Sequence, residues 1–204
     1  MHNEIQYIIS GKIPVRYGAN ILAAKNYLRD GEKTSTLDKG NKHFKKEETA
    51  RLRKYITKQN LWLKDIDLDN YISEGAEQKV YLKDEQSVVK LNDAIYYLSW
   101  VDYFNNLLLN NYFFEDTAYK LLGFFENDSV VYAVVEQSFV KADAKTNLDD
   151  VKEFMSANGF QRIRNNDYIN FEMGIIIEDL HDENVLTNKG GLYFIDTVFY
   201  VNQN

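Results

Sequence analysis

Three oxygen-bearing side chains near the end of the sequence are spaced in a way that suits phosphoryl transfer. Asp179 and Asn184 are five residues apart, and Asp196 follows Asn184 by twelve. Phosphoryl transfer asks a protein to hold nucleotide phosphates, to neutralise their charge with Mg²⁺ and to orient the attacking hydroxyl with a carboxylate. Magnesium takes a few carboxylate or amide oxygens and keeps some of its waters. The three side chains would supply these groups if the chain brings them together.

A β-hairpin between Asn184 and Asp196 would bring them together. Strands are predicted at 184–187 and 192–196, on either side of Asn188-Lys189-Gly190-Gly191, a composition typical of a tight hairpin turn. The second strand then folds back along the first, so that Asp196 returns to the level of Asn184. A hairpin with acidic, solvated ends is the alternative interpretation of the same pattern.

The preceding sequence predicts helices, then strands, and therefore an α+β fold. Residues 4–30 predict one or two helices, Gly31–Lys45 a loop and Glu47–Asn60 an amphipathic helix. Short apolar runs bounded by turn residues predict strands at 70–73, 79–82, 87–91, 121–125 and 130–135. Two more helices are expected: a buried one over Ile95–Asn110, and one over Asp149–Met155, with Asn147 or Asp149 as N-cap and Gly159 after its end.

Composition excludes several classes of protein. The 204 residues include no cysteine and three histidines, which rules out disulfides and thiolate zinc sites and leaves little material for a Ser-His-Asp hydrolase or a multi-histidine metal site. A net charge of −7 is unlike that of general nucleic-acid binders, which are usually basic. No apolar run approaches the roughly 18 residues of a membrane span. We therefore expect a cytoplasmic protein without membrane or nucleic-acid partners.

The spacing Asp-x-x-x-x-Asn, followed by a hairpin and an aspartate after an apolar strand, resembles the catalytic loop and metal-binding aspartate of protein kinases and of their aminoglycoside and choline kinase relatives. The resemblance implies that Asp179 is the catalytic base and that Asn184 and Asp196 hold Mg²⁺. His181 stands two positions after Asp179, and it is expected either to contact the γ-phosphate of ATP or to brace the loop by a hydrogen bond.

Upstream segments resemble the nucleotide-binding elements of the same kinases in the same order. The run from Glu74 to Tyr81 is similar to a phosphate-binding loop with Gly75 at its turn, and Val88-Val89-Lys90 resembles the strand whose lysine meets the α- and β-phosphates. The strand 131–135 and the following Glu136-Gln137-Ser138 resemble the hinge whose backbone pairs with adenine. The implied nucleotide-binding residues are Gly75, Lys90, Glu136 and Ser138, with Asp102 as a candidate acid to pair with Lys90.

Most of the chain is similar to the kinase domain of polyvalent proteins from phages and conjugative elements, on segments that include EETARLRKYITKQNLWL, EGAEQKVYL, DLHDENVL and YFIDT. The resemblance implies a bilobed protein kinase-like fold with a helical N-terminal extension and a truncated C-lobe. The implied domains are an extension and linker at residues 1–45 and a kinase-like domain at 46–204. Within it, the N-lobe spans about 69–135 and a minimal C-lobe spans 136–204.

The sequence also departs from the kinase pattern. Ile177-Glu178 stands where many protein kinases have His-Arg, and Thr197-Val198 follows Asp196 where a glycine is usual. The sequence given ends eight residues after Asp196, so no helices that bind a peptide substrate are expected.

Two functions follow from these observations. The first is an ATP- and Mg²⁺-dependent phosphotransferase whose acceptor is a protein hydroxyl or a small molecule. The second is a pseudokinase-type module that binds a nucleotide or a partner within a mobile-element polyvalent protein.

Overall fold

The computed structural model describes residues 2–32, 41–66, 69–74 and 78–201. Within these ranges the chain combines helices with antiparallel sheets, which confirms the predicted α+β class. The backbone forms two compact units that interleave along the sequence: unit 1 comprises 1–16, 108–118 and 140–204, and unit 2 comprises 17–107 and 119–139. The domain boundaries predicted near residues 45 and 135 stay a prediction.

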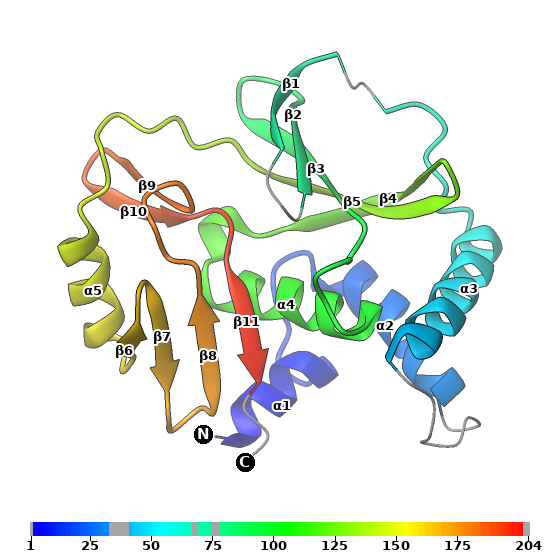
Figure 1. The fold of residues 1–204 in the computed structure, drawn as a ribbon, viewed down its shortest axis with the longest axis horizontal. Helices are drawn as coiled ribbons and strands as arrows, with labels where there is room; N and C mark the ends of the chain where they lie inside the picture. The colour runs from blue at the N-terminus through cyan, green and yellow to red at the C-terminus, as the bar shows by residue number, and fades with distance from the viewer. Residues whose placement is uncertain (1, 33–40, 67–68, 75–77, 202–204) are drawn as a thin grey trace. The chain divides into compact units, whose positions relative to one another are not determined.

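Unit 2 is built on a five-stranded antiparallel sheet with the order β1-β2-β3-β5-β4 (Figure 1). The hairpins β2–β3 and β4–β5 are joined by pairing of β3 with β5, in which Lys90 lies opposite Val135. The strands are β1 (Tyr71–Glu74), β2 (Gln78–Leu82), β3 (Ser87–Asn92), β4 (Lys120–Asn127) and β5 (Val130–Ser138).

Two helices of unit 2, α2 (Gly18–Glu32) and α3 (Asn41–Gln59), pack on one another through apolar side chains at helical spacing. Their buried apolar residues are Ile21, Ala24 and Leu28 on α2 and Leu52, Tyr55 and Ile56 on α3. The predicted loop Gly31–Lys45 is therefore shorter than expected, because α2 continues to Glu32 and α3 begins at Asn41.

The buried helix predicted over Ile95–Asn110 begins later, as α4 (Trp100–Phe113). The hydroxyl of Ser99 accepts a hydrogen bond from Asp102 N–H at 3.0 Å and donates to Asp102 Oδ2 at 2.8 Å, a reciprocal capping arrangement that fixes the first turn at Trp100. Before it, the Asn92 side chain accepts from Ala94 N–H at 2.7 Å and holds a turn. The residues Ile95, Tyr96 and Leu98 are consequently exposed.

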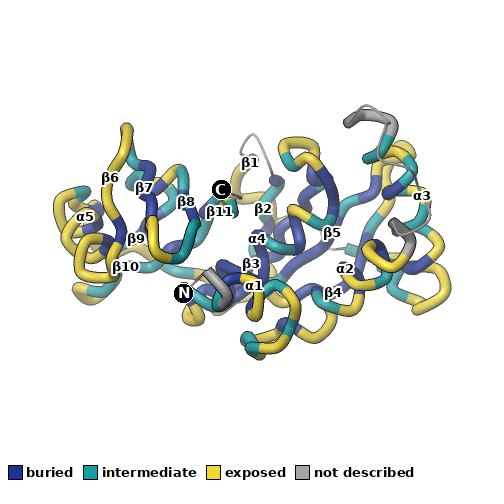
Figure 2. Tube along the Cα trace, turned by 90° about the horizontal axis from the view of Figure 1, so that it is seen from below, coloured by how far each residue is buried: buried dark blue, intermediate teal, exposed yellow. Residues whose placement is uncertain are grey.

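Unit 1 contains a four-stranded antiparallel sheet with the order β11-β8-β7-β6 and a separate hairpin of β9 and β10. The strands are β6 (Gln161–Arg164), β7 (Asp167–Asn170), β8 (Ile175–Glu178), β9 (Val185–Asn188), β10 (Gly191–Phe194) and β11 (Val198–Val201). In Figure 2 the inner strand β7 is dark blue and the edge strand β6 is yellow, in agreement with their buried and exposed side chains.

The helices α1 (His2–Ser10) and α5 (Leu148–Ala157), the last residues of α4 and the short 3₁₀ helix η1 (Glu115–Thr117) complete unit 1. Their apolar side chains form one core with the sheet and the hairpin, which includes Ile5, Ile8, Leu109, Phe114, Val151, Met155, Tyr168, Ile177, Leu180, Val185, Phe194 and Phe199. This core holds the strands on both sides of the residues predicted to do chemistry.

Several sequence predictions are confirmed in these elements. The N-cap of α5 is Asn147, whose side chain accepts a hydrogen bond from Asp149 N–H at 3.0 Å, and Gly159 follows the helix with a φ of +80°. The β9–β10 hairpin turns at Lys189 and Gly190, both at positive φ, as a tight hairpin turn requires. Among the described residues, no helix is long and apolar enough to cross a membrane.

Candidate functional site

Asp179 is the first residue after β8, and its backbone has an unusual conformation. Its φ of +70° lies in the left-handed region, which residues with a Cβ adopt at some cost in energy. Its main-chain N–H donates to Asp167 Oδ1 at 3.2 Å, and the next N–H, of Leu180, donates to Asn166 O at 3.1 Å. The backbone is thus held by the turn between β6 and β7, while 66% of the Asp179 side chain remains exposed.

The loop from Asp179 to Asn184 is closed by hydrogen bonds within itself. Asn184 donates its side-chain amide to the main-chain oxygen of Asp179 at 3.0 Å, and His181 N–H donates to the same oxygen at 2.9 Å. The first bond joins the end of the loop to its beginning, and the second tightens the turn at its beginning.

His181 lies inside this loop and braces it. Its Nδ1 accepts from Glu183 N–H at 3.2 Å, and its other ring nitrogen, Nε2, is the one near Asp179 and Asn184. That nitrogen lies 3.9 Å from Asp179 Oδ1 and 3.2 Å from the side-chain nitrogen of Asn184. Of the two roles expected for His181, the structure supports the brace; contact with a γ-phosphate stays a prediction.

Two strand ladders bring Asp196 to the same place. In the β9–β10 hairpin Val185 pairs with Phe194, and Ile195 N–H donates to Asn184 O at 2.9 Å, so Asn184 lies opposite the residue before Asp196. In the sheet, β11 pairs with β8 such that Glu178 lies opposite Val198. The ladder ends at this pair, and Asp179 and Thr197 are the next residues of the two segments. These pairings bring the main chain at Asp179, Asn184 and Asp196 to the same end of unit 1.

Buried polar side chains form hydrogen bonds to the segment around Asp196. Thr197 Oγ1 donates to Asn110 Oδ1 at 3.0 Å, and Asn110 Nδ2 donates to Thr117 O at 3.3 Å. The hydroxyl of Thr117 donates to Phe194 O at 2.5 Å. Because Asn110, Thr117 and Thr197 are all fully buried, these bonds are shielded from water and fix the chain two residues before Asp196 and one residue after it.

Asn184 and Asp196 fit a magnesium ion by their chemistry. Because the amide nitrogen of Asn184 is used by Asp179 O, its Oδ1 is the atom left to face a cation. One amide oxygen and one carboxylate are typical protein ligands for Mg²⁺ that also binds substrate phosphates. Within the part of the chain that the structure describes, no group of three or more His, Cys, Asp or Glu side chains could hold a metal by itself.

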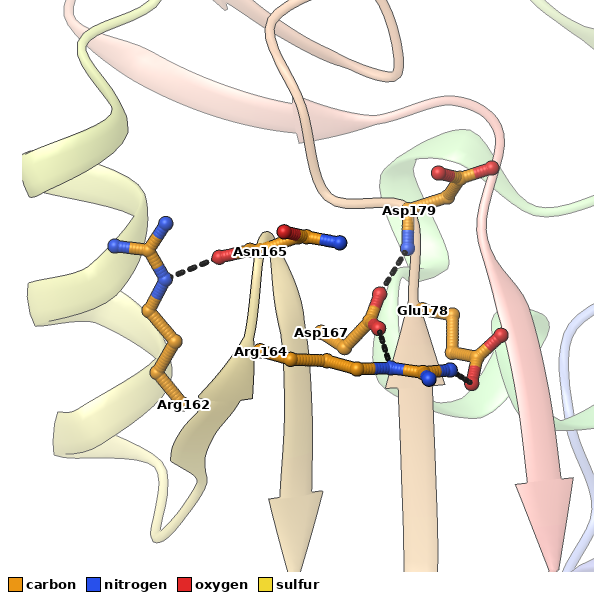
Figure 3. A network of polar contacts seen from close by, with 6 residues as sticks. All are labelled: Arg162, Arg164, Asn165, Asp167, Glu178 and Asp179. Atoms are coloured by element: carbon orange, nitrogen blue, oxygen red, sulfur yellow. Dashed lines mark hydrogen bonds and ion pairs between the residues drawn. The ribbon is translucent and has the colours of Figure 1, made fainter.

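An ion-pair network stands directly below Asp179 (Figure 3). Asp167 Oδ2 accepts from Arg164 Nε at 3.0 Å, and the same guanidinium reaches Glu178 Oε1 at 3.3 Å. The hydrogen bond that Arg164 donates to Asp167, together with the negative charges of Asp167 and Glu178, raises the pKa of Arg164 above its ordinary value. One Asp167 carboxylate thus joins the Asp179 backbone to a cation.

The predicted nucleotide-binding residues Lys90, Glu136, Ser138 and Asp102 lie in unit 2, and Gly75 lies outside the described residues. Lys90 is buried in the middle of β3 rather than solvated at a strand end. Its ammonium group lies 5.5 Å from the centroid of the Tyr119 ring, within cation–π range. The Asp102 carboxylate is bonded to Ser99, and its pairing with Lys90 stays a prediction.

At the end of β5 the main-chain groups of Ser138 and Glu136 point in different directions. Phe139 N–H donates to Gln86 O at 2.8 Å, so by the alternation of antiparallel pairs the N–H and C=O of Ser138 point away from β3. By the same alternation those of Glu136 point towards β4, where Glu136 pairs with Lys120. The side chain of Glu136 forms ion pairs with Lys83 and, at 3.6 Å, with Lys120.

Sequence reasoning missed the supporting residues Asp167, Arg164, Asn110 and Thr117. Asp167 and Arg164 flank the paired asparagines 165 and 166, a turn signal that predicts a short hairpin. Asn110 and Thr117 carry no comparable signal, because a polar residue on an apolar helix gives no indication of the distant strand that it contacts.

The comparisons with known proteins gave one match. A family model described as Serine/Threonine/Tyrosine Kinase found in polyvalent proteins matches residues 45–203. Neither the curated proteins nor the solved structures contained a match.

Proposed function

Because the chain belongs to the family of serine/threonine/tyrosine kinases found in polyvalent proteins, which supports a kinase-like function, we propose that it is an ATP- and Mg²⁺-dependent phosphotransferase. The observation that carries this proposal is the convergence of Asp179, Asn184 and Asp196, which two independent strand ladders bring to one end of unit 1. A hairpin with solvated ends would require neither the pairing of β8 with β11 nor the buried hydrogen bonds that hold the segment around Asp196.

In the proposed reaction Asp179 accepts a hydrogen bond from the acceptor hydroxyl and orients its oxygen towards the γ-phosphorus of ATP. The exposure of the Asp179 side chain, together with its closed loop, supports this role. Asn184 and Asp196 would hold Mg²⁺, which neutralises phosphate charge when bound. His181 would keep the loop closed through its contacts with Glu183 N–H and with the side chain of Asn184.

In unit 2, Lys90 would bind the α- and β-phosphates, as the predicted strand lysine does. Ser138 is the better candidate for the backbone pair with adenine. Its N–H and C=O point away from β3, and the β4–β5 pairing begins at Lys120 and Glu136, two residues before Ser138. Glu136 would act at the same strand through its ion pairs with Lys120 on β4 and with Lys83, the residue after β2.

The acceptor is a protein hydroxyl or a small molecule. The loop from Asp179 to Glu183 bears three carboxylates, of which Asp182 forms an ion pair with Lys145 at 3.4 Å.

The proposal is tested by thermal unfolding with and without Mg-ATP. A ligand at ~100 times its dissociation constant adds about 2.7 kcal/mol, or roughly 5–10 °C for a chain of this size. We expect this shift in the wild type and its loss in Asp196→Ala and Lys90→Met. Asp116→Ala, which removes an exposed acid of η1 in unit 1, is the matched control and should keep the shift.

Turnover then separates the two functions that the sequence left open. Transfer of the γ-phosphate of ATP to generic protein and sugar acceptors, abolished in Asp179→Asn, would support the phosphotransferase. An ATP-dependent shift without turnover on any acceptor or water would instead assign the chain to nucleotide binding alone. The absence of a shift in the wild type would contradict nucleotide binding, and with it the phosphotransferase, and would leave partner binding as the function.

A further inference from the structure

The turn between β6 and β7 holds the backbone of the proposed catalytic base at two consecutive amides. Asp179 N–H is bound by the Asp167 carboxylate, and Leu180 N–H by the main-chain oxygen of Asn166. Both acceptors lie on the short β6–β7 hairpin, which contains none of the site residues predicted from the sequence. This is the place where Asp179 takes its positive φ.

A residue with a Cβ adopts such a φ at a cost in energy, and the surrounding contacts must hold it there. The Asp167 carboxylate supplies one such contact, and it is itself fixed. Its side chain is only 12% exposed, and its second oxygen is bonded to Arg164 Nε at 3.0 Å. Arg164 in turn reaches Glu178, the residue before Asp179, so the ion pair closes a ring around the end of β8 (Figure 3).

The hairpin that carries Asp167 is braced as well. Arg162 donates its Nε to the main-chain oxygen of Asn165 and its terminal nitrogen to Asn166 Oδ1 at 3.1 Å. Asn165 has a φ of +43°, so the turn is tight, and Arg162 spans it from one strand to the tip. Asn166, whose main-chain oxygen binds Leu180 N–H, is therefore itself held through its side chain by a contact within the hairpin.

We propose that Asp167 is a positioning residue for phosphoryl transfer: with Arg164, it holds the main chain of Asp179 in the left-handed conformation that presents its carboxylate to the acceptor hydroxyl. The inference rests on the proposed phosphotransferase function for its catalytic meaning. Asp167 does not touch substrate in this scheme, and it acts only through the Asp179 amide.

Three variants separate positioning from a general effect on stability. Asp167→Ala removes the acceptor for Asp179 N–H, whereas Asp167→Asn keeps an oxygen there but loses the hydrogen bond and the ion pair with Arg164. Glu172→Gln is the matched control, because it removes one carboxylate from the exposed turn at the other end of β7. Far-UV circular dichroism and the melting temperature check that each variant is folded.

The first measurement is amide hydrogen exchange at Asp179, followed by NMR on isotope-labelled full-length protein. We expect exchange about tenfold or more faster in Asp167→Ala, a smaller increase in Asp167→Asn, and the wild-type rate in Glu172→Gln. Unchanged exchange in a folded Asp167→Ala would overturn the proposed link. If Asp167→Ala does not fold, a faster exchange at Asp179 in Arg164→Ala supports the link, and an unchanged rate there overturns it.

The second measurement is ATP turnover at saturating Mg-ATP. Displacing a catalytic group by about 1 Å can cost ~100-fold in rate, so kcat should fall by ~10–100-fold in Asp167→Ala, with the KM for ATP within about twofold of wild type. Asp167→Asn, which keeps only the contact with Asp179 N–H, should recover part of kcat. A rise in KM with unchanged kcat would overturn the positioning role. Absence of turnover in the wild type would contradict the proposed function instead, and the exchange measurement would then decide the link alone.

Discussion

The side-chain amide of Asn184 donates to the main-chain oxygen of Asp179 at 3.0 Å. This bond joins the two ends of the six-residue loop from Asp179 to Asn184, and it leaves the amide oxygen of Asn184 as the atom that could bind a cation. A single amide therefore has two proposed roles: its nitrogen closes the loop, and its oxygen binds the cation.

Substitution of Asn184 separates these roles. Asn184→Asp keeps an oxygen ligand but cannot donate to the Asp179 carbonyl, so ATP turnover should fall by ~10–100-fold while the Mg²⁺ requirement stays near that of wild type. Asn184→Ala should lose turnover and also require more Mg²⁺ for ATP binding. Both are measured by titrating MgCl₂ at fixed ATP. Wild-type turnover in Asn184→Asp would show that the loop does not depend on the hydrogen bond.

The sequence predicted the hairpin of the site because its signals are local. The turn Asn188-Lys189-Gly190-Gly191 needs positive φ at two central positions, and Gly190 adopts it without a steric cost. The placement of Asn147 as N-cap of α5 is equally local, since its side chain bonds to the amide two residues later.

The four-stranded sheet of unit 1 was not predicted, and its strands show why. Each strand has four residues, β7 is buried at every position and begins and ends with a polar residue, and β6 is exposed at every position. Neither shows the alternation that identifies a strand. The pairing of β8 with β11, which brings Asp179 towards Asp196, depends on contacts between distant segments and leaves no local pattern.

The buried network beneath Asp196 should contribute to stability as well as to geometry. Thr197→Val leaves Asn110 Oδ1 buried without its donor, and the free energy of unfolding should fall by about 1–3 kcal/mol. Asn110→Leu should also destabilise, because Thr117 O loses its donor. In urea unfolding, the double variant should lose about 1 kcal/mol less than the sum of the single variants. Strict additivity would contradict a direct bond.

Gly123 is required by a close approach of two backbones in unit 2. A Cβ at this position would lie 2.6 Å from the main-chain oxygen of Leu61, which accepts Phe124 N–H at 2.9 Å. Gly123→Ala should therefore destabilise the protein by about 2 kcal/mol or more, as measured by urea unfolding. Gly190→Ala is the comparison: nothing lies within 4 Å of its Cβ, and only its φ of +77° costs energy, about 1 kcal/mol. Equal losses would contradict the steric account.

Lys25 should make the stability of the protein depend on pH. It is almost fully buried on α2, and burial, together with the charge on Arg29, lowers its pKa from 10.5 to about 8. Below that pH the folded state carries the full cost of a buried ammonium group. Between pH 8 and 10.5 Lys25 is neutral when folded and protonated when unfolded, so the free energy of unfolding rises with pH by up to about 1.4 kcal/mol per unit.

Lys25→Met removes this dependence, because the buried position no longer binds a proton in either state. Urea unfolding at several pH values between about 7 and 9.5 should show a rising free energy of unfolding in the wild type and a flatter one in the variant. Lys54→Met, which replaces an exposed lysine of α3, should keep the wild-type slope. Since the ammonium is most costly at the acidic end of this range, the variant should gain most over wild type there. Parallel curves for wild type and Lys25→Met would show that the lysine keeps its proton on folding.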